Sequence, residues 1–408
     1  MENRSNDLTE ASQIDQLFNE VSLDHEVKKT NKSFFEKFKY FLLKVNESRL
    51  EFVQKVPLFS YSLKRIIYAF ITLYVAIIVS YALLRAVTTD TTYIMDLNLD
   101  KLGIKYGSPE YNNLVNNRKK LYGADGPLLK QIFIYLRNVT PIIPKDIIRD
   151  PIINSSGEIQ GRTERMWFYL GVVFGRSSGL VPGSLVQDAF KTAMPVSFML
   201  GGTAVALSYI LGVPLGIIAA RNKEKWKDST INGTSLAITA IPALVLIKLL
   251  YQMAIYVFGA GARWTDSTLY TKMFPVIGIM LMIMPIVIIE TRRYVIDEMT
   301  SDYTKFAVSK GLSGSYVFFV HVFRNAGIRI VKYIPEIFIL TMFGSSILVE
   351  RHWTVNGMSR FILDGVSDKD TFLVLGYIFC SASAGVFATL IGDLLLAVLD
   401  PRVKLTTK

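Results

Sequence analysis

The sequence has few of the residues that build catalytic and metal sites. Its 408 residues include one cysteine, Cys380, and three histidines, His25, His321 and His352, which lie far apart. A single cysteine excludes an internal disulfide and a cysteine-rich metal site, and the histidines lack metal-ligand spacing. The phosphate-binding loop, the Gly-x-Ser-x-Gly elbow and the His-Glu-x-x-His helix are all missing. We therefore expect no catalytic residue, no metal site and no cofactor bound by this chain.

Charge is also scarce. Charged residues make up 19% of the chain and hydrophobic residues 51%, and the mean hydropathy is +0.34, which is typical of a membrane protein. The net charge of +11 would suit nucleic acid or an anionic membrane, but lysines and arginines crowd the ends of apolar runs. This pattern favours a lipid bilayer over nucleic acid as a partner. No apolar segment lies near the start, so we expect no cleavable signal peptide.

Six apolar runs are long enough to cross a bilayer as helices. The first span is expected at 65–87, and a core domain at 191–400 holds the other five. These lie at 194–220, 231–258, 273–291, 331–349 and 371–393. Basic residues at the ends of the runs place both termini in the cytoplasm by the positive-inside rule. The predicted fold class is an all-α polytopic membrane protein with six transmembrane helices.

The segments outside the spans differ from one another in composition. Residues 1–33 and 401–408 are predicted to be polar cytoplasmic tails. Residues 34–64 place apolar side chains opposite lysines at helical spacing, which predicts an amphipathic helix in the membrane interface. A soluble helix packed on a partner is the alternative. Residues 88–190 have mixed polarity and form a large extracytoplasmic insertion, whose role the sequence leaves open.

The loop at 292–330, between the fourth and fifth spans, has the pattern of two short helices separated at Gly311. The first helix is capped by a side chain that accepts a backbone N–H. The candidates for this cap are Thr300, Ser301 and Asp302. Its apolar face consists of Tyr303, Phe306 and Ala307. The second helix is capped by Ser313, and its apolar stripe consists of Tyr316, Val317, Val320 and Phe323. Such a loop would present apolar side chains to a soluble partner; an ordinary amphipathic loop is the alternative.

This loop resembles the coupling loop of ABC importer permeases, in particular the B-type subunit of the oligopeptide and dipeptide transport family. The similarity rests on Ala307, on Lys310-Gly311-Leu312-Ser313 and on His321-x-x-Arg324-Asn325-Ala326. Further similar segments are Leu121–Gln131, Ile241-Pro242 and the terminal Asp-Pro-Arg at 400–402. Two features depart from the family: Arg329 stands where proline is common, and the insertion is longer than usual.

The resemblance implies a type I ABC importer permease fold and peptide import across a bacterial plasma membrane. It implies a second homologous permease, two nucleotide-binding ATPase subunits that use ATP and Mg, and an extracytoplasmic substrate-binding lipoprotein. The loop would dock on an ATPase subunit, with His321 as a structural or interface residue. The residues expected to take part in this coupling are Asp302, Tyr303, Phe306, Ala307, Lys310, Gly311, Leu312, His321, Arg324 and Asn325.

Lys248 lies inside the predicted third span, with Gln252 one turn later on the same face. A charge at that depth costs at least about 2.5 kcal/mol, so it should face a cavity or an acidic partner. We expect Lys248, Gln252 and Pro242 to line the translocation pathway, and a salt bridge of Lys248 to a carboxylate is the alternative.

Three other functions stay open at this point. A permease of the same family for nickel or another small solute is compatible with the sequence. A gradient-driven secondary transporter would be expected to show paired acids within the spans. A membrane-embedded enzyme is disfavoured by the missing catalytic motifs.

Overall fold

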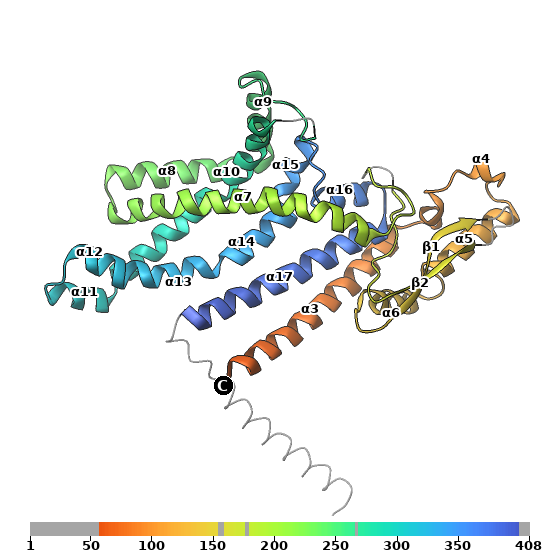
Figure 1. Ribbon diagram of the computed structural model, residues 1–408, viewed down its shortest axis with the longest axis horizontal. Helices are drawn as coiled ribbons and strands as arrows, with labels where there is room; N and C mark the ends of the chain where they lie inside the picture. The colour runs from red at the N-terminus through yellow and green to blue at the C-terminus, as the bar shows by residue number, and fades with distance from the viewer. Residues whose placement is uncertain (1–56, 154–158, 176–178, 266–267, 400–408) are drawn as a thin grey trace, which may run out of the picture. The chain divides into compact units, whose positions relative to one another are not determined.

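The computed structural model describes residues 57–153, 159–175, 179–265 and 268–399, which are mostly helical (Figure 1). Among these residues, five helices are long and apolar enough to cross a membrane, or six if one bent pair counts as a single span. The predicted all-α polytopic class is therefore confirmed. The predicted tails at 1–33 and 401–408, and the predicted interfacial helix up to residue 56, lie outside the described residues. The described residues from Lys64 onward belong to one compact unit, to which the following description applies.

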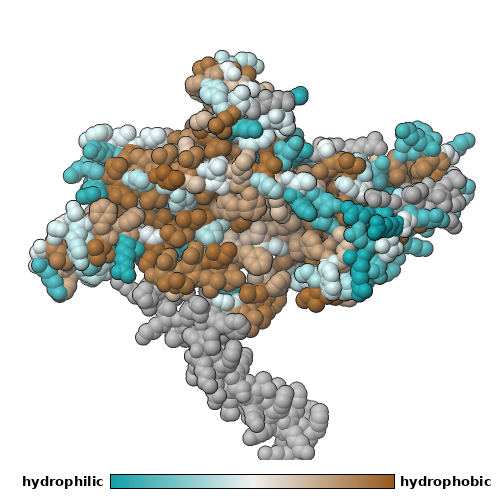
Figure 2. Space-filling view, viewed as in Figure 1, coloured by the Kyte–Doolittle hydropathy of each residue, from teal (hydrophilic) through white to brown (hydrophobic). Residues whose placement is uncertain are grey.

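The first and last long helices run side by side in opposite directions. They are α3 (Pro57–Val87) and α17 (Thr371–Leu399). At one end of the pair, the hydroxyl oxygens of Thr88 and Thr371 lie 2.8 Å apart in a hydrogen bond. At the other end, the guanidinium of Arg65 forms an ion pair with the carboxylate of Asp393. Over the molecule as a whole, hydrophobic side chains cover the middle of the helical region, and hydrophilic ones gather at the left beside α11 and α12 and at the right (Figure 2).

The central pair of helices consists of α7 (Val186–Arg221) and α10 (Leu269–Met299). Two glycines on α7 allow them to approach closely. A Cβ added at Gly216 would lie 2.7 Å from Cβ of Thr291, and one at Gly212 would lie 3.1 Å from the side chain of Val287. Small residues let helix backbones pack at short distance. A larger residue at either glycine would therefore push α7 and α10 apart.

The predicted third span at 231–258 is not one straight helix. It consists of α8 (Trp226–Ala240) and α9 (Ala243–Tyr256), which meet at an angle of 98°. Ile241 between them is extended, with φ −75° and ψ 125°. Proline disfavours a helical conformation at the preceding residue and has no N–H to donate, so Pro242 interrupts the helix. The predicted third span therefore corresponds to a bent pair of helices, interrupted at Ile241-Pro242, which counts as one span only if the two halves are taken together.

Two other predicted spans are longer in the structure. The fourth, predicted at 273–291, continues to Met299, and in its charged turns Arg293 pairs with Glu290 and Arg292 with Asp228. The fifth, predicted at 331–349, is part of a longer helical run, Gly314–His352. Its elements are α12 (Gly314–Tyr316), a π-helix (Val317–Phe323), α13 (Arg324–Lys332), α14 (Ile334–Leu340), a second π-helix (Thr341–Ser345) and α15 (Ser346–His352). The predicted coupling loop at 292–330 therefore contains the end of α10 and the beginning of this helical run.

The insertion at 88–190 folds into short helices and a hairpin. Its elements are a 3-10 helix (Asp90–Ile94), α4 (Leu99–Leu102), α5 (Pro109–Leu121), α6 (Leu128–Val139), β1 (Lys145–Ile153) and β2 (Ile159–Met166). The two strands pair antiparallel, from Lys145 opposite Met166 to Ile153 opposite Ile159, with an irregularity between Arg149 and Ile152.

Arg118 is the centre of this insertion, and its side chain is only 1% exposed. One of its terminal nitrogens donates to both carboxylate oxygens of Asp96, at 2.7 and 2.6 Å, and Nε donates to the carbonyl of Tyr93 at 2.8 Å. The guanidinium also lies 5.2 Å from the ring centroid of Tyr122 and 5.8 Å from that of Phe174. These contacts satisfy a buried charge that would otherwise be costly.

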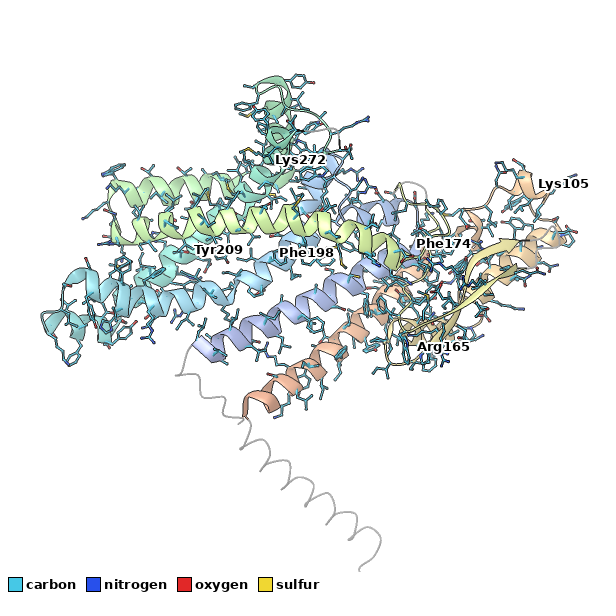
Figure 3. The ribbon with its side chains drawn as sticks, in the orientation of Figure 1. Lys105, Arg165, Phe174, Phe198, Tyr209 and Lys272 are labelled. Atoms are coloured by element: carbon cyan, nitrogen blue, oxygen red, sulfur yellow. The ribbon has the colours of Figure 1, made fainter. Side chains whose placement is uncertain are left out.

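The insertion is joined to the start of α17 by Asp370. The carboxylate of Asp370 accepts backbone N–H groups from Phe174 at 2.6 Å, Gly175 at 2.8 Å and Leu373 at 3.1 Å. Burial raises the pKa of Asp370, while the three backbone donors act in the opposite direction. Phe174 also packs on Phe372, with ring centroids 5.8 Å apart (Figure 3). The insertion is thus held by polar and aromatic contacts at the same place.

Glu350, near the end of α15, is fully buried and fixes the segment that leads to α16 (Arg360–Ser367). Its carboxylate accepts the hydroxyl of Ser197 at 2.8 Å and the backbone N–H of Ser359 at 2.9 Å. Gly357 passes so close that an added Cβ would lie 2.3 Å from the carboxyl carbon of Glu350. Only glycine fits at this position without displacing the carboxylate.

Candidate functional site

The predicted coupling loop contains α11 (Asp302–Ser309), which follows directly on α10 (Figure 1). Ser301 occupies the N-cap position, but its hydroxyl donates to the carbonyl of Glu298 at 2.7 Å. Thr304 donates to the same carbonyl at 2.8 Å. The last carbonyls of a helix have no partner within the helix, so these hydroxyls satisfy the end of α10. The predicted cap, in which a side chain accepts an N–H, was wrong, and α11 is instead fastened to α10.

The predicted apolar face of α11 is divided between two sides. Ala307 and Thr304 are buried, Tyr303 is half-buried, and Phe306 is 61% exposed. Helical positions three apart share a face, and here the small residues Thr304 and Ala307 take the inner one. Phe306 remains outside, with Nζ of Lys310 4.5 Å from its ring centroid. The prediction that Tyr303, Phe306 and Ala307 share one face was wrong.

The second half of the loop widens into the π-helix. Val317 and Phe318 are buried, whereas the predicted stripe residues Tyr316 and Val320 are exposed. A π-helix bonds to the fifth residue, so α-helical spacing does not give its faces. This stripe was therefore predicted wrongly. Several apolar side chains of the loop are exposed, and we call them the coupling surface: Phe306, Val308, Leu312, Tyr316 and Phe319.

Gly311 separates the two halves with φ 77°, the left-handed conformation that the sequence predicts. An added Cβ there would meet nothing within 4 Å, so a larger residue costs backbone strain alone. We expect Gly311→Ala to destabilise the loop by about 1 kcal/mol and to speed its local hydrogen exchange about fivefold. Gly314 also has open space but a helical backbone. Gly314→Ala should therefore leave exchange unchanged or slower, and equal acceleration in both variants would contradict this account.

Tyr303 joins α11 to two other helices. Its hydroxyl donates to the carboxylate of Glu298 on α10 and accepts the amide N–H of Asn325 on α13 at 2.8 Å. Arg329 completes the group, since its guanidinium lies 3.3 Å from the same carboxylate. Hydrogen bonds to charged groups are stronger than neutral ones. The structure thus brings together Tyr303 and Asn325 of the predicted set and adds Glu298 and Arg329.

The remaining predicted residues of the loop lie around this group. His321 is half-buried, with its ring 5.9 Å from that of Tyr316. Arg324 and Leu312 are exposed, and Asp302 pairs with Lys305 at 3.0 Å on the outside of α11. Below them a hydrophobic cluster joins the loop to α7 and α10. It consists of Ala220, Tyr294, Val295, Phe318, Val322, Ala326 and Ile330.

Sequence reasoning missed Asp228, which is buried near the start of α8. Its carboxylate accepts from Nε of Arg292 at 2.5 Å and from a terminal nitrogen of Arg292 at 2.7 Å. It also accepts the backbone N–H of Glu224 at 2.9 Å. A two-pronged arginine–carboxylate pair fixes orientation as well as distance. In the sequence, Asp228 is only one acidic residue within a basic loop. This pattern does not show that its partner is Arg292, which lies 64 residues later.

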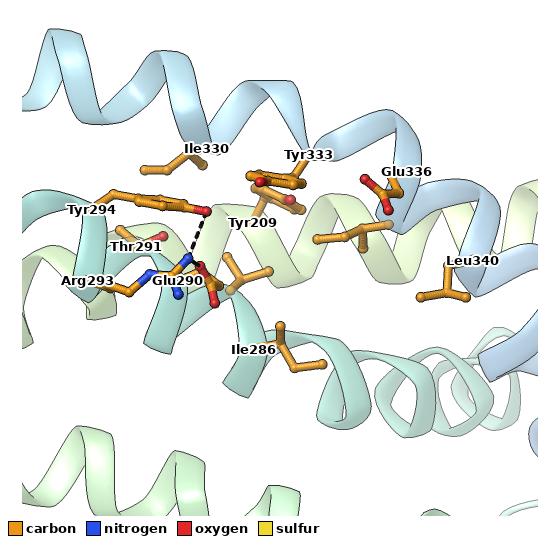
Figure 4. Close-up of a pocket in the computed structure, with 12 residues that line it drawn as sticks. Tyr209, Ile286, Glu290, Thr291, Arg293, Tyr294, Ile330, Tyr333, Glu336 and Leu340 are labelled. Atoms are coloured by element: carbon orange, nitrogen blue, oxygen red, sulfur yellow. Dashed lines mark hydrogen bonds and ion pairs between the residues drawn. The ribbon is translucent and has the colours of Figure 1, made fainter. Parts of the chain in front are cut away.

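A cavity of about 280 Å³ opens between α7, α10, α13 and α14. Figure 4 shows the guanidinium of Arg293 between Glu290 and the hydroxyl of Tyr294, to which it donates at 3.1 Å. Tyr294 and Tyr333 stack nearly parallel, with ring centroids 6.3 Å apart. The full lining is Tyr209, Ile286, Val287, Glu290, Thr291, Arg293, Tyr294, Ile330, Tyr333, Glu336, Ile337 and Leu340. The cavity adjoins the coupling loop, since Arg329 lies 5.8 Å from the Tyr294 ring.

The predicted pathway residues lie elsewhere. Lys248 and Gln252 are exposed on α9, and Nζ of Lys248 lies 6.0 Å from the ring of Tyr251. Within the described residues, Lys248 forms no ion pair. Pro242 lines a second cavity at the bend between α8 and α9, which shares Ile286 with the first.

Residues 212–405 match the family described as "Binding-protein-dependent transport system inner membrane component". This part of the chain belongs to that family. The permease domain, as we now call it, includes the coupling loop and every residue that lines the cavity of Figure 4 except Tyr209. The predicted family is confirmed for this segment, and the long apolar helices fit the predicted permease fold.

Several curated proteins are similar to the chain. It is 31% identical over 220 residues to the oligopeptide transport system permease protein AmiC of Streptococcus pneumoniae, covering 52% of this chain and 43% of AmiC. It is 27% identical over 230 residues to the dipeptide transport system permease protein DppB of Bacillus subtilis, covering 56% and 73%. For OppB of Haemophilus influenzae the identity is 26% over 291 residues, covering 71% and 84%. The chain thus matches less than half the length of AmiC.

Among solved structures, a chain of the MetNI methionine ABC transporter in an inward-facing conformation is similar, with a TM-score of 0.45 and 8% identity. The match covers 52% of this chain and 97% of that chain.

Proposed function

We propose that the chain is one permease subunit of an ATP-driven peptide importer and forms half of its translocation pathway. The observation that carries the proposal is the coupling surface, an exposed apolar set that begins on α11 and continues past Gly311 to the π-helix. Tyr303 fastens α11 to α10 and α13. Peptide as the substrate class is supported by the names of the similar permeases, AmiC, DppB and OppB. A second homologous permease and an extracytoplasmic substrate-binding protein would complete the pathway.

In this proposal two ATPase subunits use ATP and Mg, and this chain is not itself catalytic. ATP binding brings the ATPase subunits together and moves the docked α11. Tyr303 passes this movement to Glu298 at the end of α10 and to Asn325 on α13. The spans then rock between two arrangements that expose the pathway to opposite sides of the membrane. With six spans both termini would lie on the same side of the membrane, and the basic residues at the ends of the apolar runs favour the cytoplasm of a bacterial cell as that side.

The pathway is proposed to pass the bend between α8 and α9. Lys248, Gln252 and Pro242 remain our candidates for its lining. Lys248 is exposed on α9, where its ammonium is available to a peptide carboxylate. Pro242 marks the bend, and its cavity shares Ile286 with the cavity beside the coupling loop.

A pull-down of the tagged chain from gently solubilised membranes tests this function. We expect a second permease and ATPase subunits in the eluate by mass spectrometry, with ATPase activity that rises when binding protein and peptide are added. Uptake of labelled peptide into liposomes, competed by unlabelled peptide and not by nickel, would support the substrate class. Recovery of the chain alone, without ATPase activity in several mild detergents, would overturn the proposal in favour of a gradient-driven transporter.

Tyr303→Phe tests the coupling route. The variant keeps the ring but loses the hydroxyl that joins Glu298 and Asn325. Hydrogen bonds to charged groups contribute about 1.5–3 kcal/mol, so we expect at least about tenfold less peptide transported per ATP hydrolysed. ATPase subunits should still co-purify. Tyr316→Phe, which removes a hydroxyl from an exposed ring on the same loop, is the matched control and should transport normally. Equal ratios of transport to hydrolysis in the two variants would refute the route.

A further inference from the structure

The insertion does not simply stand above the membrane helices, because α6 packs along α3. The hydroxyl of Tyr81 on α3 donates to the side-chain oxygen of Gln131 on α6 at 3.4 Å, and the rings of Tyr81 and Tyr135 lie 5.6 Å apart. Further back along α3, the hydroxyl of Tyr74 lies 2.6 Å from that of Thr140, directly after α6. From Gln131 to Thr140, these side-chain contacts therefore move from the end of α3 toward the middle of the span.

The contacts between α3 and α17 can be used to estimate how deep a residue lies within the thickness of the membrane. The two helices are joined at Arg65 with Asp393 and at Thr88 with Thr371. At about 1.5 Å per residue, the stretch from Arg65 to Thr88 is about 34 Å long, close to the thickness of a hydrocarbon core. On the same scale, Tyr74 lies about 21 Å along the helix from Thr88. Thr140, bonded to Tyr74, therefore reaches well inside the thickness of the span.

The side chains around Thr140 suit an apolar environment. Ile142 is 80% exposed, Trp167 59% and Phe133 70%. We call the exposed apolar side chains of this region the apolar tip: Phe133, Ile142, Ile143 and Trp167. Leu129, at the start of α6, is exposed as well. At the same depth α3 also exposes apolar side chains, such as Ile71 and Val75. A membrane helix exposes residues of this kind to lipid, so the tip continues a lipid-facing surface.

The tip is held in place by Lys145. Its ammonium is buried and donates to the carbonyl of Thr140 and, at 2.8 Å, to the carbonyl of Trp167. Burial is also the main reason that the pKa of Lys145 is lowered. One side chain thus ties the segment after α6 to the end of the hairpin, so the exposed Ile142 and Trp167 belong to one fixed structure.

The charged groups nearby fit a lipid interface. Arg137 is exposed on α6, and the exposed Lys130 pairs with Asp125 at 2.7 Å. Long basic side chains reach from apolar depth to lipid phosphates, and tryptophan is enriched at the membrane interface. A soluble partner would have to cover the tip at a depth where α3 faces hydrocarbon.

We propose that α6 and the apolar tip lie in the bilayer leaflet nearest the insertion, so that the insertion is anchored in lipid beside α3. The occupant of the exposed apolar surface is lipid, not another protein. The insertion then has a fixed orientation to the membrane in addition to its attachment at Asp370. This proposal concerns residues outside the coupling loop and does not depend on the transported substrate.

Spin labelling tests the anchor. Cys380 is the only cysteine, so Cys380→Ser gives a background in which Ile142→Cys, Phe133→Cys and Tyr106→Cys can each carry one nitroxide. Tyr106 is 78% exposed and serves as the aqueous control within the same insertion. The full chain, with the subunits that co-purify, is reconstituted into phosphatidylcholine and phosphatidylglycerol liposomes. Collision rates of each label with oxygen and with a water-soluble nickel chelate are then measured by EPR.

We expect the ratio of oxygen to nickel-chelate collisions to be higher at Ile142 and Phe133 than at Tyr106. A label at both tip positions that is as open to the nickel chelate as Tyr106 would place the tip in water and overturn the proposal. Low collision rates with both reagents would show that protein covers the tip and would overturn it too. Because the substituted side chains are exposed, unchanged thermal unfolding of the labelled variants verifies that the fold is kept.

Discussion

Replacing Phe306 with aspartate is expected to abolish peptide uptake while the chain still inserts and folds. The ring is 61% exposed, so its removal takes little from the fold. If it fills a groove on an ATPase subunit, its loss costs at least about 2 kcal/mol of binding, as for interface aromatic anchors. That corresponds to about 30-fold weaker association, and a buried unpaired carboxylate would add to the loss.

The measurement is the amount of ATPase subunit that co-purifies with the tagged variant, followed by peptide uptake in liposomes. Tyr106→Asp is the matched control, since it places the same charge at an exposed aromatic position in the insertion. We expect normal association and uptake in that control. An F306D transporter that retains its ATPase subunits would show that α11 docks through other residues.

Asp96→Ala is expected to cause the largest loss of stability in the insertion. Arg118 is almost completely buried and would keep its bond to the carbonyl of Tyr93 but lose its charge partner. Removing one member of a buried ion pair typically costs about 3–5 kcal/mol, because the other charge is left uncompensated. Protease cleavage between α4 and α6 should therefore become rapid at temperatures where the native insertion resists it.

The control for this variant is Asp125→Ala, which breaks an exposed pair with Lys130 in the same insertion. The hydrogen bond from Lys130 lowers the pKa of Asp125, so the carboxylate is charged near neutral pH. Exposed pairs contribute about 0–1 kcal/mol, and proteolysis should change little. Similar protease sensitivity in both variants would mean that Arg118 is not the centre of the insertion.

Local features were predictable because the relevant physics lies within a few residues. The left-handed turn at Gly311 follows from the freedom of one residue type, and the close approach of α7 to α10 follows from glycines spaced along one helix. The apolar runs were found for the same reason, since each is long enough to be recognised by composition alone.

Contacts between distant segments were not predictable. Asn325 and Tyr303 meet only because the helical run after Gly311 turns back, and Asp228 meets Arg292 across two helices. The length of α10 was misjudged because its charged turns looked like an end, although their charges are paired within the protein. A sequence lists charges without their partners, so a paired charge and a solvated one look the same.

The bend at Pro242 and the π-helix were not predicted from the sequence for a different reason. Proline occurs inside α7 at Pro195 and Pro214 without ending that helix, yet it ends α8 at Ile241. Neighbouring helices decide which of these happens. The π-helix at Val317–Phe323 was missed in the same way. The apolar stripe was predicted with 3.6 residues per turn, whereas a π-helix has more residues per turn, so other side chains face inward.

The fit of Gly357 against Glu350 carries a consequence for sequence variation. Because any Cβ at 357 would overlap the carboxyl group, the two positions cannot change independently. Among related chains, glycine is expected at this position wherever glutamate stands at its partner, and a larger residue is expected only where the acid has been shortened or lost. The buried carboxylate thus imposes a rule of covariation that an alignment of relatives can verify without any experiment on the protein.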